Sequence, residues 1–207
     1  MLIGIDFDNT IVRYDRLFHH VALEKGLIPA SVPASKGDVR DYLRSIGGEQ
    51  DWIELQGIVY GVRMHEADPF PGVAAFFEGC RVAGIPVRIV SHKTRKPFAG
   101  PDCDLHAAAQ RWLHEHGFYR DPIRLEPEAA FFELTKAEKL ARVGAEGCTH
   151  FIDDLPELLG EPGFPAGVEK LLFDPSRLHI GSPFTRIESW ADASARFLAG
   201  HATRTGH

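Results

Sequence analysis

The sequence is poor in cysteine, carries no surplus of positive charge and contains no long apolar run. Its 207 residues include three cysteines, Cys80, Cys103 and Cys148, which form no C-x-x-C pair and favour unpaired thiols in a reducing compartment. Lysine and arginine number 23 against 29 acidic residues, which gives no surplus for binding a nucleic acid or an anionic membrane. No apolar run approaches the ~20 residues of a membrane span, and residues 1–6 do not resemble a signal peptide. We expect a soluble cytoplasmic protein with neither nucleic-acid nor membrane partners.

Short apolar runs rich in β-forming residues recur along the chain, and helical patterns lie between them. These runs are residues 2–5, 87–90, 130–133, 149–152 and 169–173. This alternation is typical of βαβ units, so it predicts an α/β fold with a doubly wound, Rossmann-like parallel sheet. Ligands of such sheets bind beyond the carboxyl ends of the strands, and we therefore expect the functional residues directly after these runs.

The interval between the first two runs is about eighty residues long, whereas a simple crossover needs about a dozen. Apolar residues recur there at spacings of three and four, which predicts helices. The helical stretches are residues 18–25, 39–46 and 52–60. We assign residues 13–69 to a small helical cap and residues 1–12 and 70–200 to the α/β core. Residues 201–207 are polar and are expected to form a flexible tail.

Two aspartates, Asp6 and Asp8, follow the first apolar run with one residue between them. Burying one uncompensated carboxylate is costly, and burying two side by side is worse. A metal ion or a charged substrate would compensate them. The alternative interpretation is an Asp/Asn turn after a core strand.

A second pair of acids, Asp153 and Asp154, follows the run at residues 149–152. Two such strands in one parallel sheet bring four carboxylates to one edge. Hard oxygen ligands of this kind suit Mg²⁺, which binds through a few carboxylates, several waters and a substrate phosphate. Alternatively, one of these acids caps the helix that begins near Leu155.

Two further segments offer groups that suit a phosphate. Ser91 follows the run at residues 87–90, and its hydroxyl and the neighbouring backbone N–H groups suit phosphate oxygens. Thr135 and Glu138 form a capping box at the start of a helix, which places Lys136 in its first turn. A cation in the first turn interacts unfavourably with the helix dipole. A role of Lys136 in neutralising a cluster of carboxylates and phosphate would explain its position. The alternative is a solvated surface lysine.

Taken together, these segments resemble the haloacid dehalogenase (HAD) superfamily of phosphohydrolases over nearly the whole chain, in the order and spacing of its motifs. The family's first motif is matched by Asp6, Asp8 and Thr10, and its second by Ser91. Its third is matched by Lys136, with Lys139 as the less favoured register, and its fourth by Asp153 and Asp154. The helical insert is similar to a cap that the family places between its first and second motifs. The family's dehalogenase branch lacks an acid at the position of Asp8, so its presence favours phosphate chemistry.

The resemblance implies an Mg²⁺-dependent phosphatase that acts on a small phosphorylated metabolite. Asp6 would attack phosphorus to form an aspartyl-phosphate, while Asp8 would protonate the leaving alcohol and then activate water. Ser91 and Lys136 would hold the phosphoryl oxygens. Two alternatives stay open, namely a sugar-phosphate phosphomutase of the same fold and a non-catalytic binding or regulatory protein.

The metal and substrate contacts follow from the same resemblance. Asp6, the carbonyl of Asp8 and Asp153 would hold Mg²⁺, with Asp154 as a second ligand or as an outer acceptor that orients the site. The residues that are candidates for substrate contacts are Thr10, Arg13, His92 and Lys93. The sequence does not identify the substrate.

Overall fold

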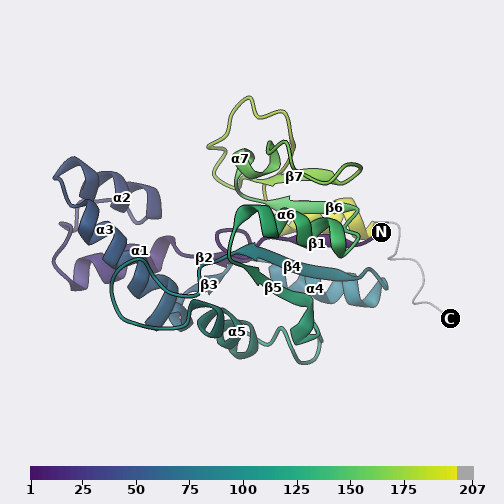
Figure 1. Ribbon diagram of the computed structural model, residues 1–207, viewed down its shortest axis with the longest axis horizontal. Coiled ribbons are helices and arrows are strands. Elements are labelled where there is room, and N and C mark those ends of the chain that lie inside the picture. The colour runs from purple at the N-terminus through teal and green to yellow at the C-terminus, as the bar shows by residue number, and fades with distance from the viewer. Residues whose placement is uncertain (200–207) are drawn as a thin grey trace. The chain divides into compact units, whose positions relative to one another are not determined.

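The computed structural model describes residues 1–199, and the chain divides into two compact units (Figure 1). Unit 1 consists of Met1–Ile11, Pro69–His92 and the chain from Gly117 onward, and unit 2 consists of Val12–Asp68 and Lys93–His116. Among residues 1–199, no helix combines the length and apolarity needed to cross a membrane. The predicted flexible tail, residues 201–207, lies outside the described residues.

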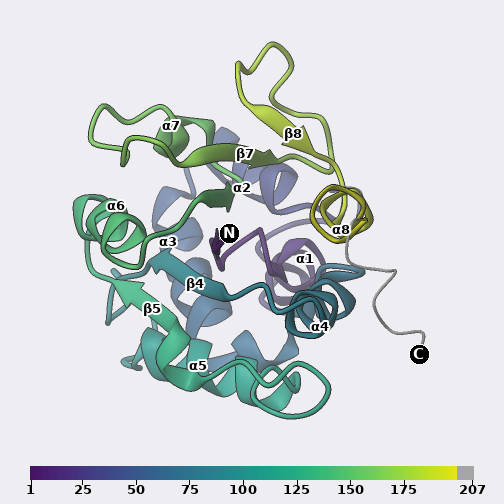
Figure 2. The ribbon, with the colours of Figure 1, turned by 90° about the vertical axis from the view of Figure 1, so that its right-hand side faces the viewer.

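Unit 1 is built on a six-stranded parallel sheet with the strand order β5-β4-β1-β6-β7-β8 (Figure 2). The strands are β1 (Ile3–Ile5), β4 (Val87–His92), β5 (Ala130–Glu133), β6 (His150–Asp153), β7 (Glu169–Phe173) and β8 (Thr185–Ile187). This confirms the predicted α/β fold and its five strands. Strand β8 was not predicted, because its three residues, Thr-Arg-Ile, are too few and too polar to form an apolar run.

Helices cover both faces of this sheet. They are α4 (Val73–Val82), α6 (Lys136–Ala145), α7 (Pro156–Leu159) and α8 (Trp190–Leu198), and a short 3-10 turn, η3 (Pro127–Ala129), precedes β5. In Figure 2, α6 and α7 lie on one side of the strands, and α4 and α8 lie on the other. The sheet is therefore doubly wound, as the sequence predicts.

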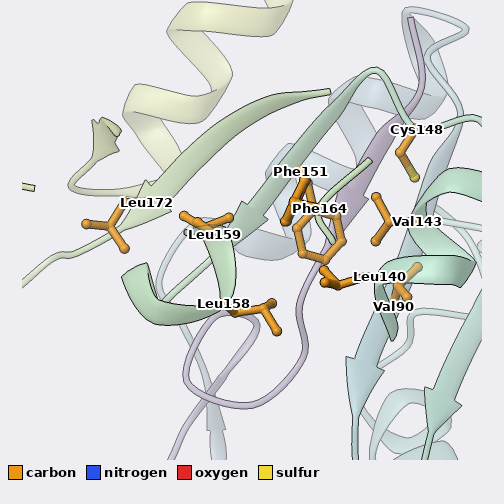
Figure 3. Close-up of a cluster of buried hydrophobic side chains, with 9 residues drawn as sticks. All are labelled: Val90, Leu140, Val143, Cys148, Phe151, Leu158, Leu159, Phe164 and Leu172. Atoms are coloured by element: carbon orange, nitrogen blue, oxygen red, sulfur yellow. The ribbon is translucent and has the colours of Figure 1, made fainter. Parts of the chain in front are cut away.

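A cluster of buried hydrophobic side chains fills the space between the sheet and the helices α6 and α7 (Figure 3). Its members are Val90, Leu140, Val143, Cys148, Phe151, Leu158, Leu159, Phe164 and Leu172. Gly4 of β1 makes room for this packing, because a Cβ there would lie 2.6 Å from Cδ2 of Phe151 and 2.8 Å from Sγ of Cys148. This packing holds α6 near the carboxyl ends of the strands, where the acidic residues lie.

The opposite face of the sheet is packed mainly with aromatic rings. Trp190 of α8 lies 4.9 Å from the ring of Phe76 in α4 and 5.4 Å from that of Phe173 in β7, between ring centres. All three side chains are buried. Such rings bury large apolar areas, so they hold α4 and α8 firmly on the sheet.

Unit 2 is mainly helical, which confirms the helical region predicted early in the chain. Its elements are α1 (Asp15–Glu24), α2 (Lys36–Ser45), α3 (Glu49–Gly57), the π-helical segment η1 (Ile58–Val62), the 3-10 turn η2 (Met64–Glu66) and α5 (Leu105–Glu115). The short strands β2 (Val12–Arg13) and β3 (Asp68–Pro69) form a two-stranded sheet where the chain passes between the units.

Residues 93–116, which the sequence analysis assigns to the core, belong to unit 2. The indole N–H of Trp112 in α5 donates a buried hydrogen bond of 2.8 Å to the carbonyl of Ala67. The backbone of Ala99 also packs so closely on Gly57 of α3 that a Cβ at Gly57 would overlap its carbonyl oxygen. The compact units therefore differ from the predicted boundaries in this segment, and the assignment of residues 13–69 to a cap stays a prediction.

Candidate active site

The carboxylates of Asp6 and Asp153 lie together because the strands that carry them are neighbours. Ile5 of β1 is opposite Ile152 of β6, and the N–H of Asp6 donates a 2.8 Å hydrogen bond to the carbonyl of Ile152. In each strand the next residue is an aspartate. Both carboxylates therefore lie at the carboxyl ends of the parallel strands, where ligands bind in such folds. Both are buried, with exposed fractions of 5% for Asp6 and 0% for Asp153.

A buried lysine from α6, Lys139, bridges these two carboxylates. Its Nζ lies 2.6 Å from Oδ1 of Asp6 and 2.6 Å from Oδ2 of Asp153. Only 3% of Lys139 is exposed. A buried ammonium paired with two buried carboxylates is a strongly coupled group whose members depend on one another for charge compensation.

The lysine that contacts the aspartates is Lys139, the register that the sequence pattern favours less, whereas Lys136 is exposed. Thr135 caps α6 as predicted, since its Oγ1 accepts a hydrogen bond of 3.1 Å from the N–H of Glu138. Lys136 is therefore the first helical residue, but its side chain is exposed. The buried face of α6 begins one turn later, at Lys139 and Leu140. A first-turn lysine that faces solvent needs no carboxylate partner.

Asp154 completes a group of three carboxylates that fits a metal ion. One carboxylate oxygen from each of Asp6, Asp153 and Asp154 lies within 4.8 Å of the other two. Clustered hard oxygen donors of this kind suit Mg²⁺. Oδ1 of Asp153 also accepts a 2.9 Å hydrogen bond from the N–H of Leu155, which fixes the orientation of that carboxylate. The donor set therefore fits the predicted cation.

The electrostatics of the cluster reflect its burial. The pKa of Asp6 is raised to about 6, mainly by burial; Lys139 lowers it, and the charges of Asp153 and Asp8 contribute to raising it. Burial alone would lower the pKa of Lys139, but Asp153 and Asp6 raise it above its ordinary value. Lys139 therefore stays protonated, and a cation bound at the cluster would favour the ionised form of Asp6.

The chain turns directly after Asp6, in the segment that carries Asp8 and Thr10. Asn9 has a left-handed backbone with φ of 59°. Thr10 is fully buried, and its Oγ1 has no hydrogen-bond partner within residues 1–199. The carbonyl of Thr10 accepts a 3.2 Å hydrogen bond from the indole N–H of Trp190. The Asp/Asn turn, the alternative interpretation of this segment, is thus present, and it lies beside a carboxylate cluster. No sequence pattern points to Trp190 as a residue that contacts this turn.

Ser91 and His92 end strand β4, which pairs with β1 on the side away from β6. Ser91 is buried, with 1% of its surface exposed. His92 is exposed, and its Nε2 makes a 3.1 Å hydrogen bond with the carbonyl of Leu134. The protein covers part of its ring, and this partial desolvation lowers the pKa of His92. The structure thus places Ser91 at the same sheet edge as the aspartates.

The other two candidates for substrate contacts, Arg13 and Lys93, belong to unit 2. Arg13 is half-buried in β2. Lys93 is buried, and its ammonium lies 5.0 Å from the centre of the Tyr60 ring. In unit 1 the structure brings together Asp6, Asp153, Asp154 and Lys139, and Asp8 lies near enough for its charge to act on Asp6.

No family model and no curated protein matches the sequence, but solved structures match its fold. A HAD family hydrolase from Deinococcus radiodurans, solved with bound phosphate and sodium, matches with a TM-score of 0.56 and 17% identity over 94% of this chain and 93% of its own. A haloacid dehalogenase-like hydrolase from Burkholderia xenovorans has a TM-score of 0.56 and 14% identity, and the match covers 96% of each chain.

A third similar structure is YfnB from Bacillus subtilis, which is described as a HAD hydrolase bound to magnesium. It matches with a TM-score of 0.54 and 12% identity over 95% of this chain and 97% of its own. At these identities the matches establish the fold alone. The chain therefore has the fold of the HAD superfamily hydrolases, which confirms the resemblance that its four motifs predict.

Proposed function

We propose that the protein is an Mg²⁺-dependent phosphatase that hydrolyses a small phosphomonoester through an aspartyl-phosphate on Asp6. The observation that carries this proposal is the cluster of Asp6, Asp153 and Asp154, with Lys139 bridging the first two, at the carboxyl edge of a parallel sheet. The HAD fold supports it as well. In this proposal unit 1 holds the reacting groups, and unit 2, which contains most of the predicted cap, has the role of a cap domain.

The metal would be held by Asp6, Asp153 and Asp154, and the magnesium found in YfnB supports this choice of ion. When bound, Mg²⁺ would offset the repulsion between the Asp6 carboxylate and the negatively charged phosphate ester. Asp153 is held for this role by the N–H of Leu155. The carbonyl of Asp8 is the further ligand that the resemblance implies.

In the first step, a carboxylate oxygen of Asp6 attacks phosphorus, and the bond between phosphorus and the ester oxygen breaks. Asp8 enters this step protonated and gives its proton to the leaving oxygen, which departs as an alcohol. Lys139 fixes the orientation of the Asp6 carboxylate through its 2.6 Å contact. The product of this step on the protein is an aspartyl-phosphate.

In the second step, a water molecule attacks the phosphorus of the aspartyl-phosphate. Asp8, now a carboxylate, takes a proton from this water, and the bond between phosphorus and the Asp6 oxygen breaks. Inorganic phosphate leaves, and both aspartates return to their starting forms. Asp8 thus acts as the acid in the first step and as the base in the second.

The phosphoryl oxygens would be held by Lys139 and by hydroxyl groups at the same edge of the sheet. Ser91 ends the strand next to β1, and the buried hydroxyl of Thr10 has no hydrogen-bond partner in the described chain. Both can donate to an oxygen of the substrate. The phosphate in the similar structure from Deinococcus radiodurans supports binding of this group by the fold.

The experiment that tests the proposal measures inorganic phosphate released from a panel of phosphomonoesters, with Mg²⁺ or with EDTA. The variants are Asp6→Asn and, as a matched control, Asp121→Asn, which changes an exposed aspartate paired with Arg124. We expect turnover by the wild type and by Asp121→Asn with Mg²⁺, and none by Asp6→Asn or in EDTA.

Other results would contradict hydrolysis. Movement of phosphate between positions of a sugar phosphate, without release, would indicate the phosphomutase alternative. Absence of both reactions across the panel, with intact binding of phosphorylated compounds, would indicate a binding or regulatory protein.

A further inference from the structure

Every second residue of strand β4 points to the same face of the sheet, and Arg88, Val90 and His92 form one such set. Nε of Arg88 donates a 3.0 Å hydrogen bond to Glu146 at the end of α6. Val90 belongs to the cluster between the sheet and this helix. Nε2 of His92 contacts the carbonyl of Leu134, two residues before α6 begins. The side chain of His92 therefore lies on the face of the sheet that α6 covers, close to the start of that helix.

Asp6 points to the same face of the sheet as His92, and both residues belong to unit 1. Gly4 pairs with Arg88 in the parallel register of β1 and β4. Two residues further on, Asp6 is therefore level with Val90 and points to the same face. His92 is two residues beyond Val90. With strands about 4.8 Å apart and a rise of about 3.3 Å per residue, the Cα atoms of Asp6 and His92 are about 8 Å apart.

This position of His92 is beside the leaving group of a substrate. When Asp6 attacks phosphorus, the leaving oxygen lies on the far side of phosphorus, roughly in line with the attacking oxygen. Because the sheet lies behind Asp6, the leaving group extends beyond the carboxyl ends of the strands, the direction in which His92 lies. We propose that Nδ1 of His92 accepts a hydrogen bond from a leaving-group hydroxyl close to the ester oxygen, so that the protein prefers phosphate esters of polyols to simple alkyl phosphates. This preference rests on the proposed phosphatase function, which supplies the leaving group.

The hydrogen bond to Leu134 determines which ring nitrogen of His92 can accept another one. A backbone carbonyl only accepts hydrogen bonds, so Nε2 of His92 carries the hydrogen in this 3.1 Å contact. In a neutral ring, Nδ1 is then an acceptor. Partial desolvation and the charges of Lys139 and Lys136 lower the pKa of His92, against the hydrogen bond to Leu134 and the charge of Asp8, which raise it. The ring is therefore neutral at pH 8.

The surroundings of His92 define the kind of donor that fits it. The residue is exposed, whereas Ile89, Val90 and Ser91 before it are buried, so a substrate can reach its ring. The charges of Lys136 and Lys139 act on this ring, and they would repel a cationic donor such as an ammonium group. A hydroxyl is neutral and donates one hydrogen bond without this repulsion. The chemistry therefore favours a polyol as the leaving group.

The first experiment compares kcat/KM for 2-hydroxypropyl phosphate and propyl phosphate, which differ in one hydroxyl, at pH 8 with Mg²⁺. We expect the wild type to prefer the first compound about tenfold, the gain from one hydrogen bond. His92→Phe removes the acceptor and should abolish this preference. His92→Gln should keep part of it, because its amide can donate to the Leu134 carbonyl and accept from the substrate. The control His114→Phe, which changes an exposed histidine of α5, should keep the preference of the wild type.

Equal kcat/KM for the two compounds in the wild type would overturn the proposal. An unchanged preference in His92→Phe, or an equal loss in His114→Phe, would overturn it as well. Thermal unfolding followed by circular dichroism shows whether each variant is folded. If His92→Phe does not fold, the second experiment, which observes the native ring, decides the result alone.

The second experiment observes the ring nitrogens of His92 by nitrogen-15 NMR in Asp6→Asn with Mg²⁺, so that the substrate is not turned over. The signals of His92 are those that disappear when His92→Gln is added. We expect hydrogen on Nε2, and a larger shift of the Nδ1 signal with 2-hydroxypropyl phosphate than with propyl phosphate. Hydrogen on Nδ1, or equal shifts with the two compounds, would overturn the proposal. If the wild type hydrolyses no phosphomonoester but the shifts differ as expected, the proposed function fails while the hydroxyl contact of His92 stands.

Discussion

Replacing Lys139 by methionine tests how the buried acidic cluster is stabilised. The ammonium lies 2.6 Å from each of Asp6 and Asp153, and at an effective dielectric constant of about 20 each pair contributes roughly 6 kcal/mol of Coulomb energy. Desolvation of the three buried groups offsets much of this. Removing one partner of such a buried group leaves uncompensated charge, so we expect Lys139→Met to lower the free energy of unfolding by about 3–5 kcal/mol in EDTA.

The assay is urea unfolding at equilibrium, with the slope m compared among the variants. The control Lys136→Met removes the exposed lysine three residues earlier and should change the free energy by no more than about 0.5 kcal/mol. Adding Asp153→Asn to Lys139→Met removes one of the uncompensated charges and should restore about 1–3 kcal/mol. A loss below about 1 kcal/mol in Lys139→Met, or an equal loss in Lys136→Met, would show that Lys139 does not stabilise the buried carboxylates.

Three further predictions follow from other parts of the structure. Trp190→Phe removes the donor to the Thr10 carbonyl and should lower the free energy of unfolding by about 1–3 kcal/mol in urea; a loss as small as that of an exposed substitution would contradict this. Mg²⁺ at a hundred times its Kd should stabilise the wild type by about 2.7 kcal/mol in thermal unfolding, and Asp153→Asn should abolish most of this shift; equal shifts would show that the cation binds elsewhere. Burial raises the pKa of the Cys80 thiol to about 12 and that of Cys148 to about 11, so both should resist alkylation at pH 8 in the folded protein and react in urea; rapid alkylation of either without urea would contradict the burial.

The sheet and the acidic edge could be predicted because local sequence determines them. An apolar run that ends in aspartates marks both β1 and β6, and the parallel arrangement then brings Asp6 and Asp153 together. Strand β8 could not be predicted, because a short edge strand forms through its pairing with β7 and has no apolar pattern of its own.

The choice between Lys136 and Lys139 depended on where the buried face of α6 begins. The capping residue Thr135 fixes the start of the helix, but the depth of each side chain depends on how the helix packs on the sheet. The buried positions Leu140 and Val143 mark that face, and Lys139 is the lysine adjacent to Leu140, which was the available signal.

Long-range contacts had no signal in the sequence. Trp190 supports Thr10 from 180 residues away, and residues 93–116 join unit 2 through contacts such as that of Trp112 with Ala67. Neither pairing follows a periodicity or a motif, because each depends on the tertiary arrangement of distant elements.

Trapping the phosphorylated form of Asp6 shows whether this residue is the nucleophile. The enzyme is quenched during turnover with Mg²⁺, reduced with borohydride, which converts an aspartyl-phosphate to homoserine, and digested for mass spectrometry. We expect homoserine at position 6 in the wild type and none in a sample without substrate. Release of phosphate with position 6 unmodified, or with the modification at another aspartate, would contradict this expectation.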